Sequence, residues 1–263
     1  MSAATSRWFA VGVGTAARRA LAERGGLAFT LTFYAVIVVV ITALWRAAAE
    51  SGGGTVAGYD ATALTWYILA SEAATVALNI RMIEVVGDDI ASGAVATEML
   101  RPASVLGVRM AAEIGRALPR LAGCAAVGVV VGATTVGAVP SAAGLALSVP
   151  ALVLAIAANL LAQHAFAAAA FWVRDARSTW FLYQKLVFIL GGMLLPLETL
   201  PGWLHGVASA LPFMAMAYVP GRLASGHVEA QLLVVQAAWI AVLAGVAATA
   251  FAAGERRVQA VGG

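Results

Sequence analysis

Charged residues are scarce in this sequence of 263 residues. They make up 11% of the chain, whereas 62% of the residues are hydrophobic and the mean hydropathy is +0.91. A soluble domain carries about 25% charged residues, because polar side chains must cover its surface. This chain has too few of them to cover a globule in water. The sequence therefore predicts an all-α integral membrane protein with a single domain, residues 1–263.

Disulfides, metal centres and nucleotide binding each lack the residues that they need. Cys124 is the only cysteine, which excludes an internal disulfide or a cysteine metal cluster. The histidines have no carboxylate or second histidine at ligand spacing, so no metal site is expected. The only lysine, Lys185, is followed by Leu186 rather than by Ser or Thr, so the chain has no P-loop. We expect a chain that is not an enzyme and binds no cofactor itself.

Long apolar runs take up most of the chain. A membrane span needs about 20 mainly apolar residues. The sequence predicts six spans with an interfacial helix before them, at residues 1–25 for that helix and 26–45, 61–80, 104–139, 145–172, 179–195 and 232–254 for the spans. The interfacial helix is expected because the first residues mix arginines with apolar side chains; a signal peptide is the competing interpretation.

The arginines are distributed unevenly between the two sides of these spans. Nearly all lie at the side that holds both termini and residues 81–102, whereas only Arg46 and Arg222 lie at the other. Basic residues accumulate on the cytoplasmic side of a membrane. The pattern predicts a multi-pass protein of the cell (cytoplasmic or inner) membrane with both termini in the cytoplasm and the lipid bilayer as its surroundings. The formal net charge of +3 is too small to indicate a nucleic-acid partner.

Glu72 lies near the middle of the second predicted span. An ionisable side chain at this depth costs at least about 2.5 kcal/mol, so it usually faces a cavity or a partner. Its candidate partners are Lys185, Gln184 and His164, if their spans meet the second span, and Asn159 is a further polar residue of the fourth. These residues either line a substrate path or, through a Glu72–Lys185 pair, fasten helices together.

Four charged residues share one face of the third predicted span. Arg109, Glu113, Arg116 and Arg120 are spaced at i, i+4, i+7 and i+11. Such a face cannot contact lipid tails. It lines a watery vestibule, contacts a partner, or is the solvated cytoplasmic end of a long helix.

Residues 81–102 form a charged segment between apolar runs. Asp88 and Asp89 are placed to cap the N-terminus of a short helix, Gly93 permits close approach of a neighbour, and Pro102 ends the helix before the next span. A short rigid helix on the cytoplasmic face suits docking to a soluble partner. An ordinary solvated loop is the alternative.

Residues 196–229 differ from the rest of the chain in their proline content. The apolar piece within them, residues 207–219, is too short to cross a membrane and is broken at Pro212. A re-entrant or interfacial hairpin on the outer side is therefore expected.

Two stretches resemble a known family. Residues 90–102, IASGAVATEMLRP, resemble the cytoplasmic segment after the second span of type-2 ABC exporter permeases. Residues 192–204, GMLLPLETLPGWL, followed by LPF at 211–213 and YVPG at 218–221, are similar to the stretch before the last span of that family. The Leu-Arg-Pro ending is typical of a branch in which permeases of this length work as pairs of related subunits with a separate ATPase.

The resemblance implies a permease subunit that forms half of a pathway for a small amphiphilic, drug-like or lipid-like substrate, working by alternating access. Its partners would be a second related permease, favoured over an identical copy, and two cytoplasmic P-loop ATPase subunits that bind ATP and Mg. The implied ATPase-docking residues are Asp88, Asp89, Ile90, Gly93, Glu98, Arg101 and Pro102. The implied outer gate consists of Pro196, Glu198, Pro201, Trp203, Pro212 and Phe213. An ion-coupled secondary transporter or channel is the alternative class.

Overall fold

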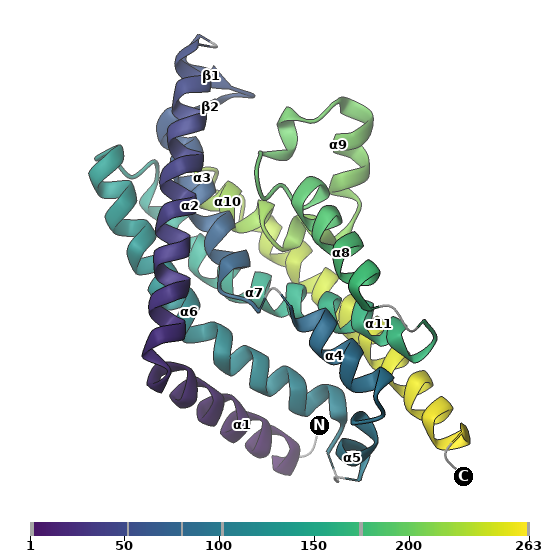
Figure 1. The fold of residues 1–263 in the computed structure, drawn as a ribbon. Helices are drawn as coiled ribbons and strands as arrows, with labels where there is room; N and C mark the ends of the chain where they lie inside the picture. The colour runs from purple at the N-terminus through teal and green to yellow at the C-terminus, as the bar shows by residue number, and fades with distance from the viewer. Residues whose placement is uncertain (1–2, 52, 80, 101–102, 174–175, 262–263) are drawn as a thin grey trace.

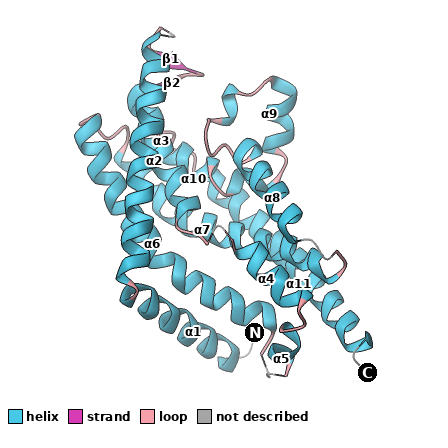
Figure 2. Ribbon diagram, in the orientation of Figure 1, coloured by secondary structure: helices cyan, strands magenta, loops and turns pink. Residues whose placement is uncertain are grey.

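The computed structural model describes residues 3–51, 53–79, 81–100, 103–173 and 176–261, and this part of the chain is mostly helical (Figures 1 and 2). Arg101 and Pro102 lie outside the described residues. The helices are α1 (Ala3–Ala22), α2 (Arg24–Ser51), α3 (Ala61–Val76), α4 (Met82–Ala91), α5 (Val95–Met99), α6 (Val105–Thr135), α7 (Ala142–Ala167), α8 (Ala176–Leu190), α9 (Gly202–Ser209), α10 (Tyr218–Ala224) and α11 (Gln231–Val261). Short 3-10 helices are η1 (Ala168–Phe171), η2 (Leu197–Thr199) and η3 (Pro212–Ala215), and a two-stranded antiparallel hairpin pairs β1 (Thr55–Val56) with β2 (Tyr59–Asp60).

Four helices are long and apolar enough to cross a membrane. They cover Arg24–Ser51, Val105–Thr135, Ala142–Phe171 and Gln231–Val258. They coincide with four of the six predicted spans, and the prediction of an all-α multi-pass membrane protein is confirmed at this level. The other two predicted spans correspond to α3 and α8, which have 16 and 15 residues. Each is shorter than the length of about 20 residues that crosses a bilayer without help.

The ends of the helix bundle carry different elements. Helices α1 and α5 and both chain termini lie toward one end, whereas the β hairpin and α9 lie toward the opposite end (Figure 1). Within the predicted hairpin, α9 and α10 have eight and seven residues, and the chain between them turns at Pro212. Neither helix is long enough to span a membrane.

Helix α3 is the most enclosed part of the bundle. Every residue from Leu64 to Ala74 is buried, because α2, α6, α7 and α10 pack around it. Its sequence is apolar on all sides, which is the pattern of a helix that is surrounded by others. Its first turn is capped by Asp60, whose Oδ1 accepts a hydrogen bond from the Ala63 amide at 2.7 Å. The position of α3 places Glu72 inside the protein rather than against lipid.

Helix α1 packs along the first half of α6 and leaves its other side exposed, with Val11 68% exposed. This amphipathic arrangement agrees with the predicted interfacial helix. The two helices approach each other closely at Gly115 of α6, where an added Cβ would clash with the Val13 carbonyl oxygen and stand 2.6 Å from the Ala16 Cβ. The two helix backbones meet here because glycine has no side chain.

Replacing Gly115 with alanine is therefore expected to separate α1 from α6. Overpacking of this kind costs about 1–3 kcal/mol, so the thermal unfolding midpoint of the purified protein in detergent should fall. Gly14→Ala is the matched control, because a Cβ at Gly14 meets nothing within 4 Å and alanine favours a helix over glycine. An unchanged midpoint for Gly115→Ala would contradict the close packing.

Candidate functional site

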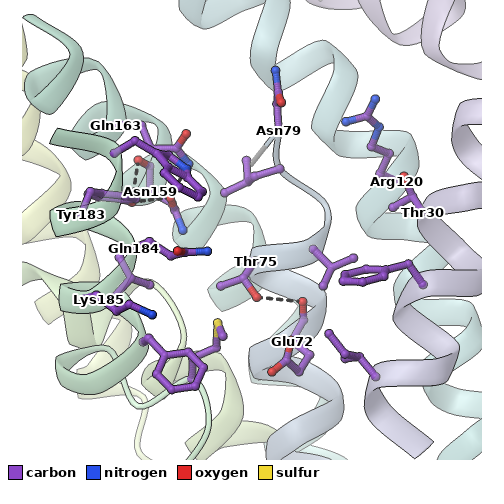
Figure 3. A pocket seen from close by; sticks show the side chains of 18 of the residues that line it. Thr30, Glu72, Thr75, Asn79, Arg120, Asn159, Gln163, Tyr183, Gln184 and Lys185 are labelled. Atoms are coloured by element: carbon purple, nitrogen blue, oxygen red, sulfur yellow. Dashed lines mark hydrogen bonds between the residues drawn. The ribbon is translucent and has the colours of Figure 1, made fainter. Parts of the chain in front are cut away.

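A cavity of about 640 Å³ opens between α2, α3, α7 and α8 (Figure 3). Its volume lies within the range of about 300–1,000 Å³ that is typical of sites for small molecules. Its wall is mainly apolar and aromatic, with side chains such as Phe29 and Phe33 from α2 and Trp180 and Phe188 from α8. Of the residues that the sequence predicted for a substrate path, the cavity brings together Glu72, Asn159, Gln184 and Lys185.

Glu72 supplies the acidic group of this cavity from α3. The residue is 2% exposed, and its Oε1 atom has no hydrogen-bond partner among the described residues. The Thr75 hydroxyl donates to the Glu72 main-chain oxygen at 3.1 Å and so does not satisfy the carboxylate. A buried polar atom without a partner is costly. The carboxylate of Glu72 is therefore the group in the cavity that most needs a donor.

A Glu72–Lys185 ion pair, the predicted helix fastening, is not present within 4.0 Å in the part of the chain that the structure describes. The Lys185 Nζ atom instead lies 5.1 Å from the centre of the Phe181 ring on its own helix. Figure 3 shows the lysine pointing from α8 into the space in front of α3. Both charges thus face the cavity without neutralising each other.

The α7 wall of the cavity holds a fixed amide group. Asn159 Oδ1 accepts hydrogen bonds from Gln163 Nε2 at 2.7 Å and from the Tyr183 hydroxyl at 2.5 Å (Figure 3). Asn159 and Gln163 are four residues apart on α7 and therefore lie on one face. That spacing was visible in the sequence, but the contribution of Tyr183 from α8 was not. The two hydrogen bonds to its oxygen fix the orientation of the Asn159 amide in the cavity wall.

His164 does not line this cavity, although the sequence placed it in the substrate path. Its Nδ1 atom lies 2.8 Å from the Leu160 carbonyl oxygen, and its ring faces Phe251 of α11 with centroids 6.1 Å apart. The reason is helical geometry, because consecutive residues of a helix point about 100° apart. Gln163 points toward the cavity, and His164, the next residue, therefore points toward α11.

The charged face of α6 is divided between two places. Arg120 lines the cavity, at the same end as Asn79 (Figure 3). Arg116 pairs with Glu113 three residues before it on the same helix. The side chain of Arg109, in the second turn of α6, extends away from the cavity and contacts the segment 81–102. The face therefore serves both as a cavity wall and as an intrachain contact.

Within residues 81–102, the predicted cap is wrong. Asp88 and Asp89 lie in the last turn of α4 rather than at a helix N-terminus, because the helix begins at Met82, immediately after Arg81. The helix ends at Ala91, and Gly93, two residues further on, has φ +79°; a Cβ there would meet nothing within 4 Å. Gly93 is thus required for a left-handed turn and not for close approach of a neighbour.

Arg109 ties this segment to α6. Its guanidinium donates to Asp89 Oδ2 at 2.7 Å and makes two bonds of 2.9 Å to the carboxylate of Glu98 on α5. The arginine side chain is 13% exposed, whereas Asp89 and Glu98 are 38% and 31% exposed, so water reaches the carboxylates and screens these bonds in part. Two charge-assisted contacts from one fork hold α4, α5 and α6 in a fixed relation.

The other docking residues of the segment differ in accessibility. Ile90 is only 6% exposed and belongs to the core, so it is not available to a partner as placed. Asp88 is exposed, and so are two apolar side chains that the sequence did not single out, Val85 at 50% and Leu100 at 86%. These three belong to the accessible part of the segment.

At the opposite end of the bundle, Arg222 of α10 joins residues from distant parts of the chain. It donates to Glu198 Oε1 at 2.7 Å, to Glu229 Oε1 at 2.8 Å and to the Tyr59 hydroxyl at 2.6 Å. Tyr218 donates to Glu198 at 2.6 Å. We call these five residues the outer cluster. Of them, only Glu198 was predicted as a gate residue.

Tyr59 acts as both acceptor and donor in the outer cluster. Burial is the main cause that raises its pKa above the ordinary value, although the bond from Arg222 opposes the shift. The phenol therefore stays protonated, and it donates to Glu198 Oε2 at 3.3 Å while it accepts from Arg222. Burial, followed by the charge of Arg222, lowers the pKa of the neighbouring His227, whose ring lies 5.0 Å from that of Tyr59.

The remaining predicted gate residues lie at or near the starts of the short helices in residues 196–229. Pro196 and Pro201 immediately precede η2 and α9, and Pro212 is the first residue of η3, as expected for a residue with fixed φ and no amide donor. Trp203 is 74% exposed on α9. Phe213 is buried, with its ring 6.5 Å from that of Tyr183.

A family model described as ABC-2 family transporter protein matches residues 31–262. The match extends from α2 to α11 and includes the segment 81–102, the outer cluster and all the cavity-lining residues except Phe29 and Thr30. No curated protein matches the chain.

Proposed function

Because the chain belongs to the ABC-2 family of transporter proteins, in which it is a permease component that works with an ATPase component, we propose that it forms half of an export pathway for a small amphiphilic, drug-like or lipid-like substrate. The observation that carries this proposal is the cavity between α2, α3, α7 and α8. It combines an apolar and aromatic wall with a buried acid at Glu72, and such a combination suits a molecule with an apolar body and a polar group.

In the proposed arrangement α3 and α8 are the two remaining spans, which gives six. Both termini and the segment 81–102 face the cytoplasm, and residues 196–229 form a hairpin at the outer side. The uneven distribution of arginines supports this orientation, as does the position of both termini at one end of the bundle (Figure 1).

The ATPase component would dock at the segment 81–102. Its exposed residues Val85, Asp88 and Leu100 offer an apolar and acidic surface. Two ATPase copies would bind ATP and Mg, and this chain would hydrolyse no ATP, since its only lysine does not belong to a P-loop. A second, related permease would complete the pathway on the other side of the cavity.

ATP-driven transport by the whole complex tests the proposal. The tagged chain would be purified with its associated subunits and reconstituted into vesicles with short-chain fluorescent amphiphiles of different charge. We expect a P-loop ATPase and a second permease to copurify, and ATP to drive accumulation of at least one amphiphile. A chain that purifies alone, or transport that ignores ATP, would contradict the proposal.

A bulky residue in the cavity is expected to block transport without preventing assembly. Thr30 lines the cavity, and its hydroxyl donates to the Gly26 oxygen of its own helix. Thr30→Trp should reduce ATP-driven transport at least about tenfold, because the indole occupies space that the substrate needs; this corresponds to about 1.4 kcal/mol. Val246→Trp on the exposed side of α11 is the matched control and should transport normally. Equal rates for the two variants would place the pathway elsewhere.

A further inference from the structure

Three charged side chains share the cavity without pairing to one another. Glu72 comes from α3, Lys185 from α8 and Arg120 from α6. Within the described residues, no ion pair joins any two of them. Ionisable groups in a membrane protein usually pair with each other or with a ligand. An acid and two bases that all face one cavity are therefore arranged for the charges of a ligand.

The acid is the group with the strictest requirement. Glu72 is 2% exposed, and its Oε1 atom is buried without a partner. An ammonium group offers the charge and the hydrogen that this oxygen lacks. A neutral ligand without a donor would leave the carboxylate unsatisfied, and an anionic ligand would repel it.

The two basic side chains disfavour a ligand whose only charge is positive. Lys185 reaches into the space in front of α3, and Arg120 lies at the cavity end near Asn79 (Figure 3). Their two positive charges outnumber the single carboxylate among the cavity residues. A cationic amphiphile would satisfy Glu72 but would also meet these like charges, which costs binding energy. Asn159, whose amide oxygen is bonded to Gln163 and Tyr183, adds a neutral polar side chain to the same wall.

We propose that the cavity selects a zwitterionic amphiphile, with a primary ammonium on Glu72 and an anionic group on Lys185 and Arg120. The apolar part of the ligand lies against the aromatic side chains of α2 and α8, of which Phe29 and Phe33 are 73% and 46% exposed. This inference rests on the proposed function and narrows its substrate class.

Binding of three matched probes tests the charge requirement. All carry the same NBD-labelled six-carbon chain and differ in the headgroup: a phosphoethanolamine (zwitterion), its N-acetylated form (anion) and a primary alkylammonium (cation). The complete transporter complex in nanodiscs is titrated with each probe by fluorescence anisotropy. We expect the zwitterion to bind at least about tenfold more tightly than either other probe, because only the zwitterion satisfies both kinds of charge.

Two charge-neutralising variants assign each headgroup charge to its partner. Glu72→Gln should make the affinities for the zwitterion and the anion equal. Lys185→Gln should reduce the ratio of the affinity for the zwitterion to the affinity for the cation. Glu50→Gln and Arg256→Gln neutralise exposed charges outside the cavity and should change neither ratio. Equal affinities of the wild-type complex for the three probes, tightest binding of the cation, or binding of none of them would overturn the inference.

The same vesicles separate this inference from the proposed function. If ATP drove transport of the cation or the anion in preference to the zwitterion, the proposed export function would stand and the inferred selection of a zwitterion would be wrong. Absence of ATP-driven transport for all three probes would reject both. The wild-type comparison needs no variant to fold, so the inference stays testable even if Glu72→Gln is unstable.

Discussion

Loss of the Arg109 guanidinium is expected to uncouple ATP hydrolysis from transport. In Arg109→Gln, Asp89 and Glu98 lose the cation that holds both to α6, and two carboxylates remain close together without it. Movement of the segment 81–102 would then no longer be passed to α6 as a rigid-body displacement. We expect transport per ATP hydrolysed to fall at least about tenfold, while the ATPase component still copurifies, because the proposed docking residues Val85, Asp88 and Leu100 are unchanged.

Two further variants make this prediction specific. Arg109→Lys keeps the charge but lacks the fork that bonds to two carboxylates at once, so its coupling ratio should be intermediate. Arg116→Gln is the matched control, since Arg116 pairs with Glu113 on its own helix and is 43% exposed. If Arg109→Gln transported as efficiently per ATP as Arg116→Gln, the contact between the segment and α6 would have no part in coupling.

The second large effect is expected at the opposite end of the bundle. Arg222→Gln should loosen residues 196–229, because Glu198 and Glu229 both lose their cation and Tyr59 loses its donor. Breaking a fully buried ion pair costs about 3–5 kcal/mol. Arg222 is 18% exposed and its carboxylate partners are 25% and 34% exposed, so we expect about 2 kcal/mol after solvent screening. The readouts are the unfolding midpoint and the rate of protease cleavage within residues 196–229.

Arg46 provides the control for this experiment. It is predicted on the same side of the membrane as Arg222, and its Nη1 atom makes one hydrogen bond of 3.3 Å to the Thr135 oxygen. Arg46→Gln should therefore shift the midpoint far less. In addition, Glu198→Gln combined with Arg222→Gln should recover part of the loss, since it removes one of the two uncompensated carboxylates. Equal midpoints for Arg222→Gln and wild type would show that the outer cluster does not hold this region.

The segment 81–102 and His164 show where sequence patterns failed. A cap assignment depends on the residue at which a helix begins, and α4 begins earlier than the aspartates suggested. For His164, the sequence pattern identified a polar residue in an apolar helix, but it did not show which other helix faces that residue. The sequence could identify candidates in both places, whereas the boundary and the facing helix depended on packing.

The amino-acid sequence by itself determined the class of the protein and its long membrane helices. Length and hydropathy suffice for α2, α6, α7 and α11, because a bilayer requires a minimum apolar length of any helix that crosses it. Glu72 could likewise be identified from the sequence as an acid within an apolar run. The residue pattern also located the proline-rich segment, since proline marks the starts of its short helices.

Only the tertiary structure decided which polar groups meet. Glu72 and Lys185 share a cavity without pairing, and the Arg222–Tyr59 contact joins residues 163 positions apart. Periodicity fixes the face of a helix on which a side chain lies, but the partner of that face depends on how distant helices pack. The packing of α2, α6 and α7 against α3, with α8 at the other side of the cavity, therefore placed an acid and two bases at one cavity, and the packing of α10 against α3 brought Arg222 to the β hairpin.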